Sequence, residues 1–278
     1  DLWLPTHRAG KSTLDCYKAA VKYFEPVWGL RMADIDVDDL QECIDTCPHG
    51  KRTKENMRAV CGLVYKYGIP RHVVPDNLNL APYLIVGGDK AAHRASFTAD
   101  QISAIKKQIG KTPGAEQVYM LIYLGYRPSE FLDLQVQDYD PKRKCIVAGA
   151  KTTAGIGRTV TVSPKIQKYV AEAAQNAAGA LIRDPDGKAY KLKDWTENVF
   201  YAVLEAAGID NPMVTVGGGD QRHKYTPHSC RHTFATLLKR AAGSEKDKIE
   251  LIGHASGEQL RYYQDVELDD LRKLTDQL

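Results

Sequence analysis

Two arginines and two histidines stand at the ends of apolar segments, where a buried helix would give way to a turn. Arg127 follows the apolar run GAEQVYMLIYLGY, and His228 with Arg231 opens the segment HSCRHTFATLL. His254 stands in LIGHAS, directly after another apolar run. A guanidinium presents paired donors that match phosphate oxygens, and an imidazole donates to the same oxygens or moves a proton near neutral pH. These residues predict a site that holds a phosphate.

A lysine and two tyrosines supply the other groups that phosphodiester chemistry needs. Lys151 falls at the tip of a predicted hairpin, where it can protonate a departing alkoxide. Tyr262 and Tyr263 follow His254, and nearby cations would lower the tyrosine pKa from about 10 and so activate the hydroxyl. The two guanidiniums supply charge stabilisation that other enzymes take from Mg²⁺. The set therefore predicts exchange through a phosphotyrosine, without a metal or another cofactor.

Zinc binding is the main alternative for the histidines. His228 and His232 lie four residues apart, as in zinc proteases, but Ser229 stands where that motif needs a glutamate. We therefore expect His232 to pack or to cap inside the fold. Residues 43–49 carry two cysteines and a histidine without a second ligand pair, which argues against zinc there too. The six cysteines are predicted to be reduced thiols.

Composition sets weak limits on the partner. The chain has 278 residues, is 43% hydrophobic and carries a formal net charge of +3. This charge permits a nucleic-acid partner only if basic residues gather on one face. No apolar run reaches membrane-span length and no signal peptide is evident, so we expect a cytoplasmic protein. The first residue is Asp1 rather than Met, which suggests that an upstream segment was removed.

Helical periodicity organises the first part of the chain. Amphipathic helices are predicted over 12–28, 37–46 and 53–67, forming a helical domain of residues 1–85. The three tryptophans (Trp3, Trp28 and Trp195) are expected to serve packing. Four basic residues gather near the third helix and predict either contact with a nucleic-acid backbone or a solvated polar face: Lys51, Arg52, Lys54 and Arg58.

A second domain is predicted after a linker at 86–95, over residues 96–278. Helical pattern resumes with Thr98 as N-cap, and 114–126 reads as a central buried helix. Residues 143–164 predict a β-hairpin, in which Arg158 is expected to contact a backbone phosphate. Further helices are expected over 165–178, 194–207, 230–241 and 245–252, before a last helix with a leucine stripe.

Taken in series, these residues resemble the active site of the tyrosine recombinase (phage-type integrase) family. The matching phrases are GYRPSEFLDL, KTTAGIGRTV, HSCRHTFATLL, LIGHAS and YYQDVELDDL. They run in the family's order over residues 96–278, and the helices at 12–67 are more loosely similar to its core-binding domain. The sequence segment HSCRHTFAT looks closest to integrases of phages and conjugative transposons.

The resemblance implies a mainly α fold with a small β-sheet. The helical core-binding domain and the catalytic domain would form a C-shaped clamp around double-stranded DNA. A homo-tetramer on two duplexes would exchange strands in two steps through a Holliday junction, integrating or excising a mobile element in a prokaryotic cell. The last helix would dock on a neighbouring protomer, although the sequence leaves docking on its own domain open.

The resemblance also implies a role for each residue. Tyr263 would attack the phosphodiester to give a 3′-phosphotyrosyl link and a free 5′-hydroxyl, without ATP. The other roles follow the family's pattern: Arg127 and Arg231 on the non-bridging oxygens, Lys151 as general acid, His228 in proton transfer at the nucleophile, His254 as hydrogen-bond donor, and Glu130 orienting the arginine–histidine cluster.

Three points stay open at the level of sequence. Tyr263 is favoured over Tyr262 as nucleophile because it gives the family's spacing between the nucleophile and the last helix, whereas Tyr262 is one residue off. Asp265 stands at a position where the family commonly has histidine. A type IB topoisomerase would use similar chemistry as a monomer without site preference. A non-catalytic DNA-binding regulator on the same fold is a further alternative, against which the intact residue set argues.

Overall fold

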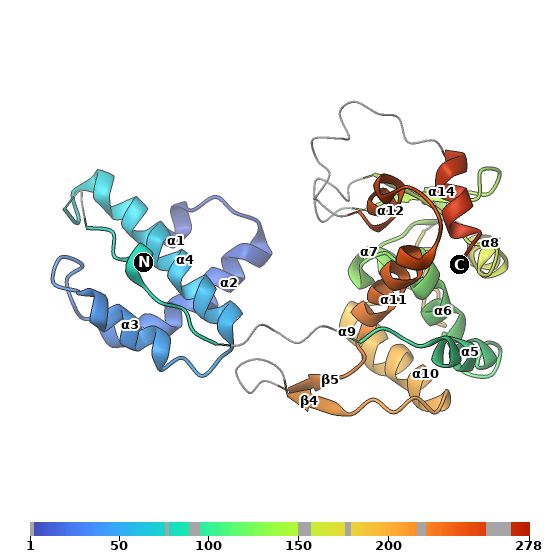
Figure 1. Cartoon of the computed structure of the whole chain (residues 1–278), viewed down its shortest axis with the longest axis horizontal. Coiled ribbons are helices and arrows are strands. Elements are labelled where there is room, and N and C mark those ends of the chain that lie inside the picture. Colours follow the sequence, from blue (N-terminus) through green and yellow to red (C-terminus); the bar gives the residue numbers. More distant parts are fainter. Residues whose placement is uncertain are drawn as a thin grey trace. The chain divides into compact units, whose positions relative to one another are not determined.

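The chain folds into two compact units, seen in the computed structural model of Figure 1. One unit comprises residues 1–93 and 213–222, and the other comprises 94–212 and 223–278. The structure describes residues 3–75, 78–88, 95–149, 157–175, 179–215, 221–253 and 268–278. Over these residues the fold is mainly helical with small sheets, and no helix is both long and apolar enough to cross a lipid bilayer.

Short helices around one core build the N-terminal unit. Asp36 caps its third helix by accepting a hydrogen bond from the Asp39 backbone at 2.9 Å. Ile44 and Met57 are fully buried and mark the centre of the core. The predicted helix at 12–28 changes to a 3₁₀ helix at Lys22, because Pro26 interrupts α-helical hydrogen bonding. The helices are α1 (Trp3–Thr6), α2 (Lys11–Val21), η1 (Lys22–Val27), α3 (Val37–Asp45), α4 (Lys51–Gly68), η2 (Ile69–Arg71) and η3 (Ala81–Tyr83).

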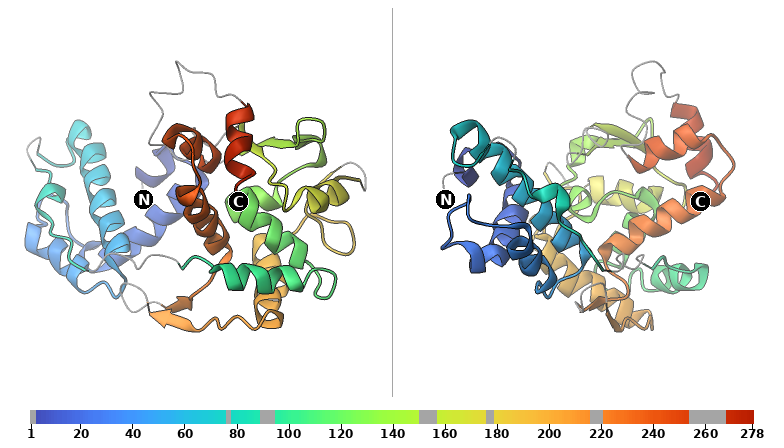
Figure 2. Two further views of the ribbon diagram at one scale, coloured as in Figure 1. Left: turned by 45° about the vertical axis from the view of Figure 1, so that its right-hand side comes forward. Right: turned by 60° about the vertical axis from the view of Figure 1, so that its left-hand side comes forward.

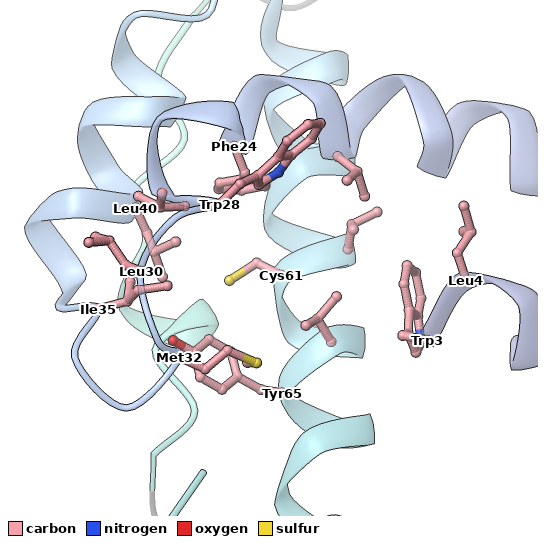
Figure 3. Close-up of a pocket in the computed structure, with 14 residues that line it drawn as sticks. Trp3, Leu4, Phe24, Trp28, Leu30, Met32, Ile35, Leu40, Cys61 and Tyr65 are labelled. Carbon is pink, nitrogen blue, oxygen red and sulfur yellow. The ribbon is translucent and has the colours of Figure 1, made fainter. Parts of the chain in front are cut away.

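An apolar pocket of about 330 Å³ opens beside α4 in this unit (Figure 3). The Cys61 thiol points into it, and burial raises the pKa of that thiol to about 12, so the sulfur stays protonated at neutral pH. Trp3 and Trp195 are buried as predicted. Trp28 lines this pocket and remains 58% exposed, so it is less completely covered than the other two tryptophans.

Helix α6 (Ala115–Leu124) forms the centre of the second unit. All its apolar side chains are buried, as predicted for 114–126, and it packs against α11 (Pro227–Arg240), as both views in Figure 2 show. Glycines in the left-handed conformation flank it at both ends, with φ of 77° at Gly114 and 62° at Gly125. Gly125 therefore turns the chain sharply into the segment that begins at Tyr126.

The predicted hairpin is present as part of a small antiparallel sheet. β2 (Cys145–Ala148) pairs with β3 (Arg158–Thr161), and the Ala148–Arg158 pair stands nearest to the turn. β1 (Tyr139–Asp140), which was not predicted, adds a short third strand beside β2. A second unpredicted hairpin pairs β4 (Met213–Thr215) with β5 (Gln221–His223).

The other helices of the second unit largely follow the predicted order. A capping box at Thr98 starts the first of them, as expected. Predicted helix 194–207 contains a π-helical turn, and predicted helix 230–241 begins earlier, at Pro227, a residue favoured in the first turn. The elements are α5 (Ala99–Lys107), α7 (Pro128–Leu132), η4 (Val136–Asp138), α8 (Gln167–Gln175), α9 (Leu192–Trp195), η5 (Thr196–Phe200), α10 (Tyr201–Ala206), α12 (Glu245–Ile252) and α14 (Leu268–Thr275).

Helix α14 packs on β3 and α12 of its own unit. Leu271 and Leu274 are buried, and the Thr161 hydroxyl donates to the Leu271 carbonyl at 3.1 Å. The Thr161 and Thr275 hydroxyls also lie 2.7 Å apart. The leucine stripe is thus covered in cis, the arrangement that the sequence left open beside docking on a neighbour.

Replacing Gly125 with alanine is expected to destabilise the fold by about 2–4 kcal/mol, through left-handed strain and overpacking. A Cβ at Gly125 would lie 2.1 Å from Cδ1 of Phe234. Gly110→Ala is the matched control, because its φ is also positive and no atom lies within 4 Å of the added carbon. We expect that control to cost about 1 kcal/mol. Urea unfolding measures both, and equal losses would contradict the packing of α6 against α11.

Candidate active site

Arg127 is held at the corner between α6 and α7 by Glu130. Its backbone N–H donates to Oε2 of Glu130 at 3.1 Å, and its Nη1 donates to Oε1 at 2.7 Å. Glu130 is only 5% exposed, whereas the Arg127 side chain is partly exposed. One carboxylate therefore fixes both the backbone and the guanidinium of Arg127, and leaves other N–H groups of that guanidinium for a ligand.

Arg231 is anchored between the ends of two helices. It lies in the first turns of α11 and is 8% exposed. Its Nη1 donates to the Gly125 carbonyl at 2.7 Å, and its Nη2 donates to the Ile252 carbonyl at 2.5 Å. These carbonyls stand at the C-terminal ends of α6 and α12, where helix dipoles favour a cation. Both of these hydrogen bonds position Arg231 through backbone carbonyls.

Arg158 lies at the same corner, and its position corrects the expectation from the sequence. We predicted that it contacts a DNA backbone phosphate, but its side chain is fully buried. Nη1 lies 3.5 Å from Oε2 of Glu130, Nη2 donates weakly to the Gly125 carbonyl at 3.5 Å, and the guanidinium carbon lies 4.3 Å from the centre of the Tyr126 ring. Such a side chain has no surface with which to reach a duplex.

The cluster of Arg127, Arg158, Arg231 and Glu130 carries more positive than negative charge. Burial alone would raise the pKa of Glu130, but hydrogen bonds from Arg127 and the charge of Arg158 outweigh burial and lower it below the ordinary value. Burial, followed by repulsion from Arg158 and Arg127, lowers the pKa of Arg231 to about 9. Three guanidiniums around one carboxylate therefore form a site in which an added anion is stabilised.

The two histidines of α11 occupy different environments. His228 is half-buried on the same first turns of α11 as Arg231. His232 is exposed, so the prediction that it packs or caps inside the fold is wrong. Within the described residues, no group of three or more His, Cys, Asp or Glu side chains could hold a metal ion. All six cysteines are free thiols.

The other predicted site residues lie outside the described part of the chain. These are Lys151, His254, Tyr262, Tyr263 and Asp265. Two described positions adjoin them in sequence: the Ala148–Arg158 pair at the base of the hairpin that carries Lys151, and Gly253, which ends α12 directly before His254.

Sequence reasoning missed the backbone part of the site. The carbonyls of Gly125 and Ile252 and the ring of Tyr126 hold two of the three arginines. A signal existed, because LGYR and LIGH each place a glycine after an apolar run, the usual pattern at a helix C-terminus. Such an end exposes carbonyls, and a buried arginine is a suitable partner for them.

The predicted DNA-binding residues of the N-terminal unit all lie on the first turns of α4. Gly50 provides no side-chain cap there, and the first turn contains no acidic residue. Several of the basic side chains already bond to the fold: Arg52 to Glu55 at 3.3 Å, Lys54 to the Asp45 carbonyl at 3.3 Å and Arg58 to the Leu84 carbonyl at 3.3 Å. Because cations oppose the positive end of the helix dipole, this surface favours an anion.

The chain is similar in sequence to proteins of known family. The model of the phage integrase family matches residues 95–269. Tyrosine recombinase XerC of Ralstonia pickettii is 26% identical over 157 residues, which are 55% of this chain and 43% of that protein. The chain thus matches less than half of the length of that relative.

Solved structures share the fold. The Tn1549 transposon integrase in complex with a circular intermediate DNA has a TM-score of 0.71 at 17% identity, covering 95% of this chain and 93% of that one. The lambda integrase tetramer bound to a Holliday junction has a TM-score of 0.67 at 15% identity, covering 95% and 77%. With more than half of its residues matched by the family model, the chain belongs to the phage integrase family of tyrosine recombinases.

Proposed function

We propose that this chain is a site-specific DNA recombinase that cleaves and rejoins strands through a 3′-phosphotyrosyl intermediate. The observation that carries the proposal is the convergence of Arg127 and Arg231 on one corner of the fold, where Glu130 and two helix ends hold them. Their excess positive charge suits a phosphodiester whose non-bridging oxygens gain charge as the phosphorus becomes pentacoordinate.

In this proposal Tyr263 supplies the nucleophile. Its oxygen bonds to phosphorus while the bond to the 5′ oxygen breaks, and Lys151 gives that leaving oxygen a proton. His228 takes up the tyrosine proton and His254 donates a hydrogen bond to the phosphate. Because the phosphotyrosine conserves the bond energy, a 5′-hydroxyl from another strand reverses the steps without ATP. The described residues of the site need no metal for this charge stabilisation.

We further propose that the chain acts as a homo-tetramer on two duplexes and moves a mobile element into or out of DNA. Support comes from the sequence phrases shared with integrases of phages and conjugative transposons, and from the fold shared with a transposon integrase and with a tetrameric lambda integrase. In the assembly the surface that covers Leu271 and Leu274 in cis would receive the last helix of a neighbour.

A nicked suicide duplex tests the chemistry. Duplexes that the protein binds are selected from a randomised library, and the selected site is nicked near the cleaved phosphate so that the released fragment diffuses away. We expect a covalent adduct that is lost in Tyr263→Phe and kept in the matched control Tyr262→Phe, because only the first hydroxyl attacks. Denaturing gels measure the adduct.

Other outcomes of that assay assign other functions. An adduct that survives in Tyr263→Phe would move the nucleophile elsewhere. No adduct with the unmodified protein on any bound duplex would favour a DNA-binding regulator. Relaxation of supercoiled plasmid by a monomer, without site preference, would favour a topoisomerase.

Salt dependence tests the basic surface of α4. Arg52→Ala should flatten the slope of log Kobs against log salt concentration by about 0.9, because one phosphate contact is lost. Arg31→Ala is the matched control: Arg31 belongs to the same unit, is 85% exposed where Arg52 is 83% exposed, and also pairs with an acidic residue three positions away. Filter binding over a salt series measures both. Equal slopes for both variants and the parent protein would rule out this surface as a DNA contact.

A further inference from the structure

Arg158 touches the partners of both arginines that are proposed to grip the phosphate. Nη1 of Arg158 lies 3.5 Å from Oε2 of Glu130, and Nη1 of Arg127 lies 2.7 Å from Oε1 of the same carboxylate. Nη2 of Arg158 lies 3.5 Å from the Gly125 carbonyl oxygen, to which Nη1 of Arg231 donates at 2.7 Å. The buried side chain of Arg158 thus contacts both acceptors: the Glu130 carboxylate that holds Arg127 and the Gly125 carbonyl that holds Arg231.

Burying a guanidinium is costly in free energy, and Arg158 is buried with few short polar contacts. Nε and Nη1 of Arg158 make no hydrogen bond among the described residues, and its two polar contacts are long. A buried charge of this kind is a poor device for stability, since apolar residues of similar volume often serve as well. Its geometry points instead to a role in the site.

The position of Arg158 also joins the two segments that lead to the remaining predicted site residues. It is paired with Ala148 at the base of the hairpin that carries Lys151. Its Nη1 also lies so close to Gly253 that a Cβ there would come within 2.5 Å of it. Gly253 has a φ of 68° and directly precedes His254. The hairpin, the α6–α7 corner and the end of α12 therefore meet at this guanidinium.

We propose that Arg158 is a positioning residue for strand cleavage: it holds Glu130 and the Gly125 carbonyl in place so that Arg127 and Arg231 present their free N–H groups to one phosphate. This inference rests on the phosphotyrosyl mechanism proposed above. Arg158 itself does not touch DNA. Its loss lets Arg127 and Arg231 move relative to each other, and small misplacements of this kind reduce rates by about 100-fold.

The charge of Arg158 adds a dependence on pH. Glu130 faces Arg127, Arg158 and Arg231, while Arg158 faces Tyr126 and, from α12, Glu250. Because the pKa of Glu130 is lowered, its ion pairs are complete above the ordinary carboxyl pKa and are lost as the pH falls through the lowered value. Without Arg158 the pKa of Glu130 rises. The acid limb of the cleavage rate against pH should therefore move to higher pH.

The test compares Arg158→Met, Arg158→Lys and the control Arg143→Met, which removes an exposed arginine near the same hairpin. Each variant of the whole 278-residue chain reacts with the nicked duplex at saturating protein, over a pH series that begins below the ordinary carboxyl pKa and ends at mildly alkaline pH. The Kd for intact duplex is measured separately. We expect Arg158→Met to cleave about 100-fold more slowly with little change in Kd and an acid limb moved to higher pH. Arg158→Lys should cleave about tenfold faster than Arg158→Met and keep the acid limb of the parent protein. Lysine retains the positive charge but lacks the paired N–H donors of the guanidinium.

Other results overturn the inference. These are a cleavage rate of Arg158→Met close to that of the unmodified protein, a loss confined to Kd, or an unchanged acid limb. If Arg158→Met does not fold, as judged by thermal unfolding, Arg158→Lys decides: a rate about tenfold below the parent at equal Kd supports the role, and a parent rate contradicts it. Absence of an adduct with the unmodified protein would instead contradict the phosphotyrosyl mechanism itself.

Discussion

The active-site corner depends on one buried carboxylate that must serve more than one cation. Glu130 accepts two hydrogen bonds from Arg127 and lies beside Arg158, while Arg231 stands close enough for its charge to be felt. A buried carboxylate would ordinarily tend to take up a proton, and here the arginines keep it ionised. Among the described residues of this corner the arginines outnumber the carboxylates, and this excess of positive charge is what prepares the corner for a phosphate.

The fold supplies this corner by ending helices at it. α6 ends at Gly125 and α12 ends at Gly253, and both ends turn carbonyl groups toward arginines. Because α6 is buried on all sides, the position of Gly125 is fixed by the core rather than by the surface. A change in core packing at Phe234 would therefore be transmitted to the guanidinium of Arg231 through one carbonyl. Stability and the geometry of the site are coupled at that residue.

Sequence reasoning predicted the parts of the site that have a local signal. The buried helix before Arg127, the hairpin around Arg158 and the cap at Thr98 all follow from apolar pattern, β-branched residues and turn chemistry. It did not predict which side of the hairpin Arg158 faces, because one residue of register decides between core and surface. His232 was misplaced for a similar reason, since helical spacing gives a face but not what covers it. The cis packing of α14 depends on contacts far apart in sequence, such as Thr161 with Thr275.

The proposed mechanism requires that Arg127 and Arg231 together hold one phosphate of the DNA backbone. The most direct measurement is a structure of Tyr263→Phe bound to its uncleaved duplex. We expect non-bridging oxygens of a single phosphate within hydrogen-bonding distance of both guanidiniums, with Glu130 still bonded to Arg127. A backbone that passes without any phosphate near them, while Arg231 keeps only its bonds to the Gly125 and Ile252 carbonyls, would contradict it.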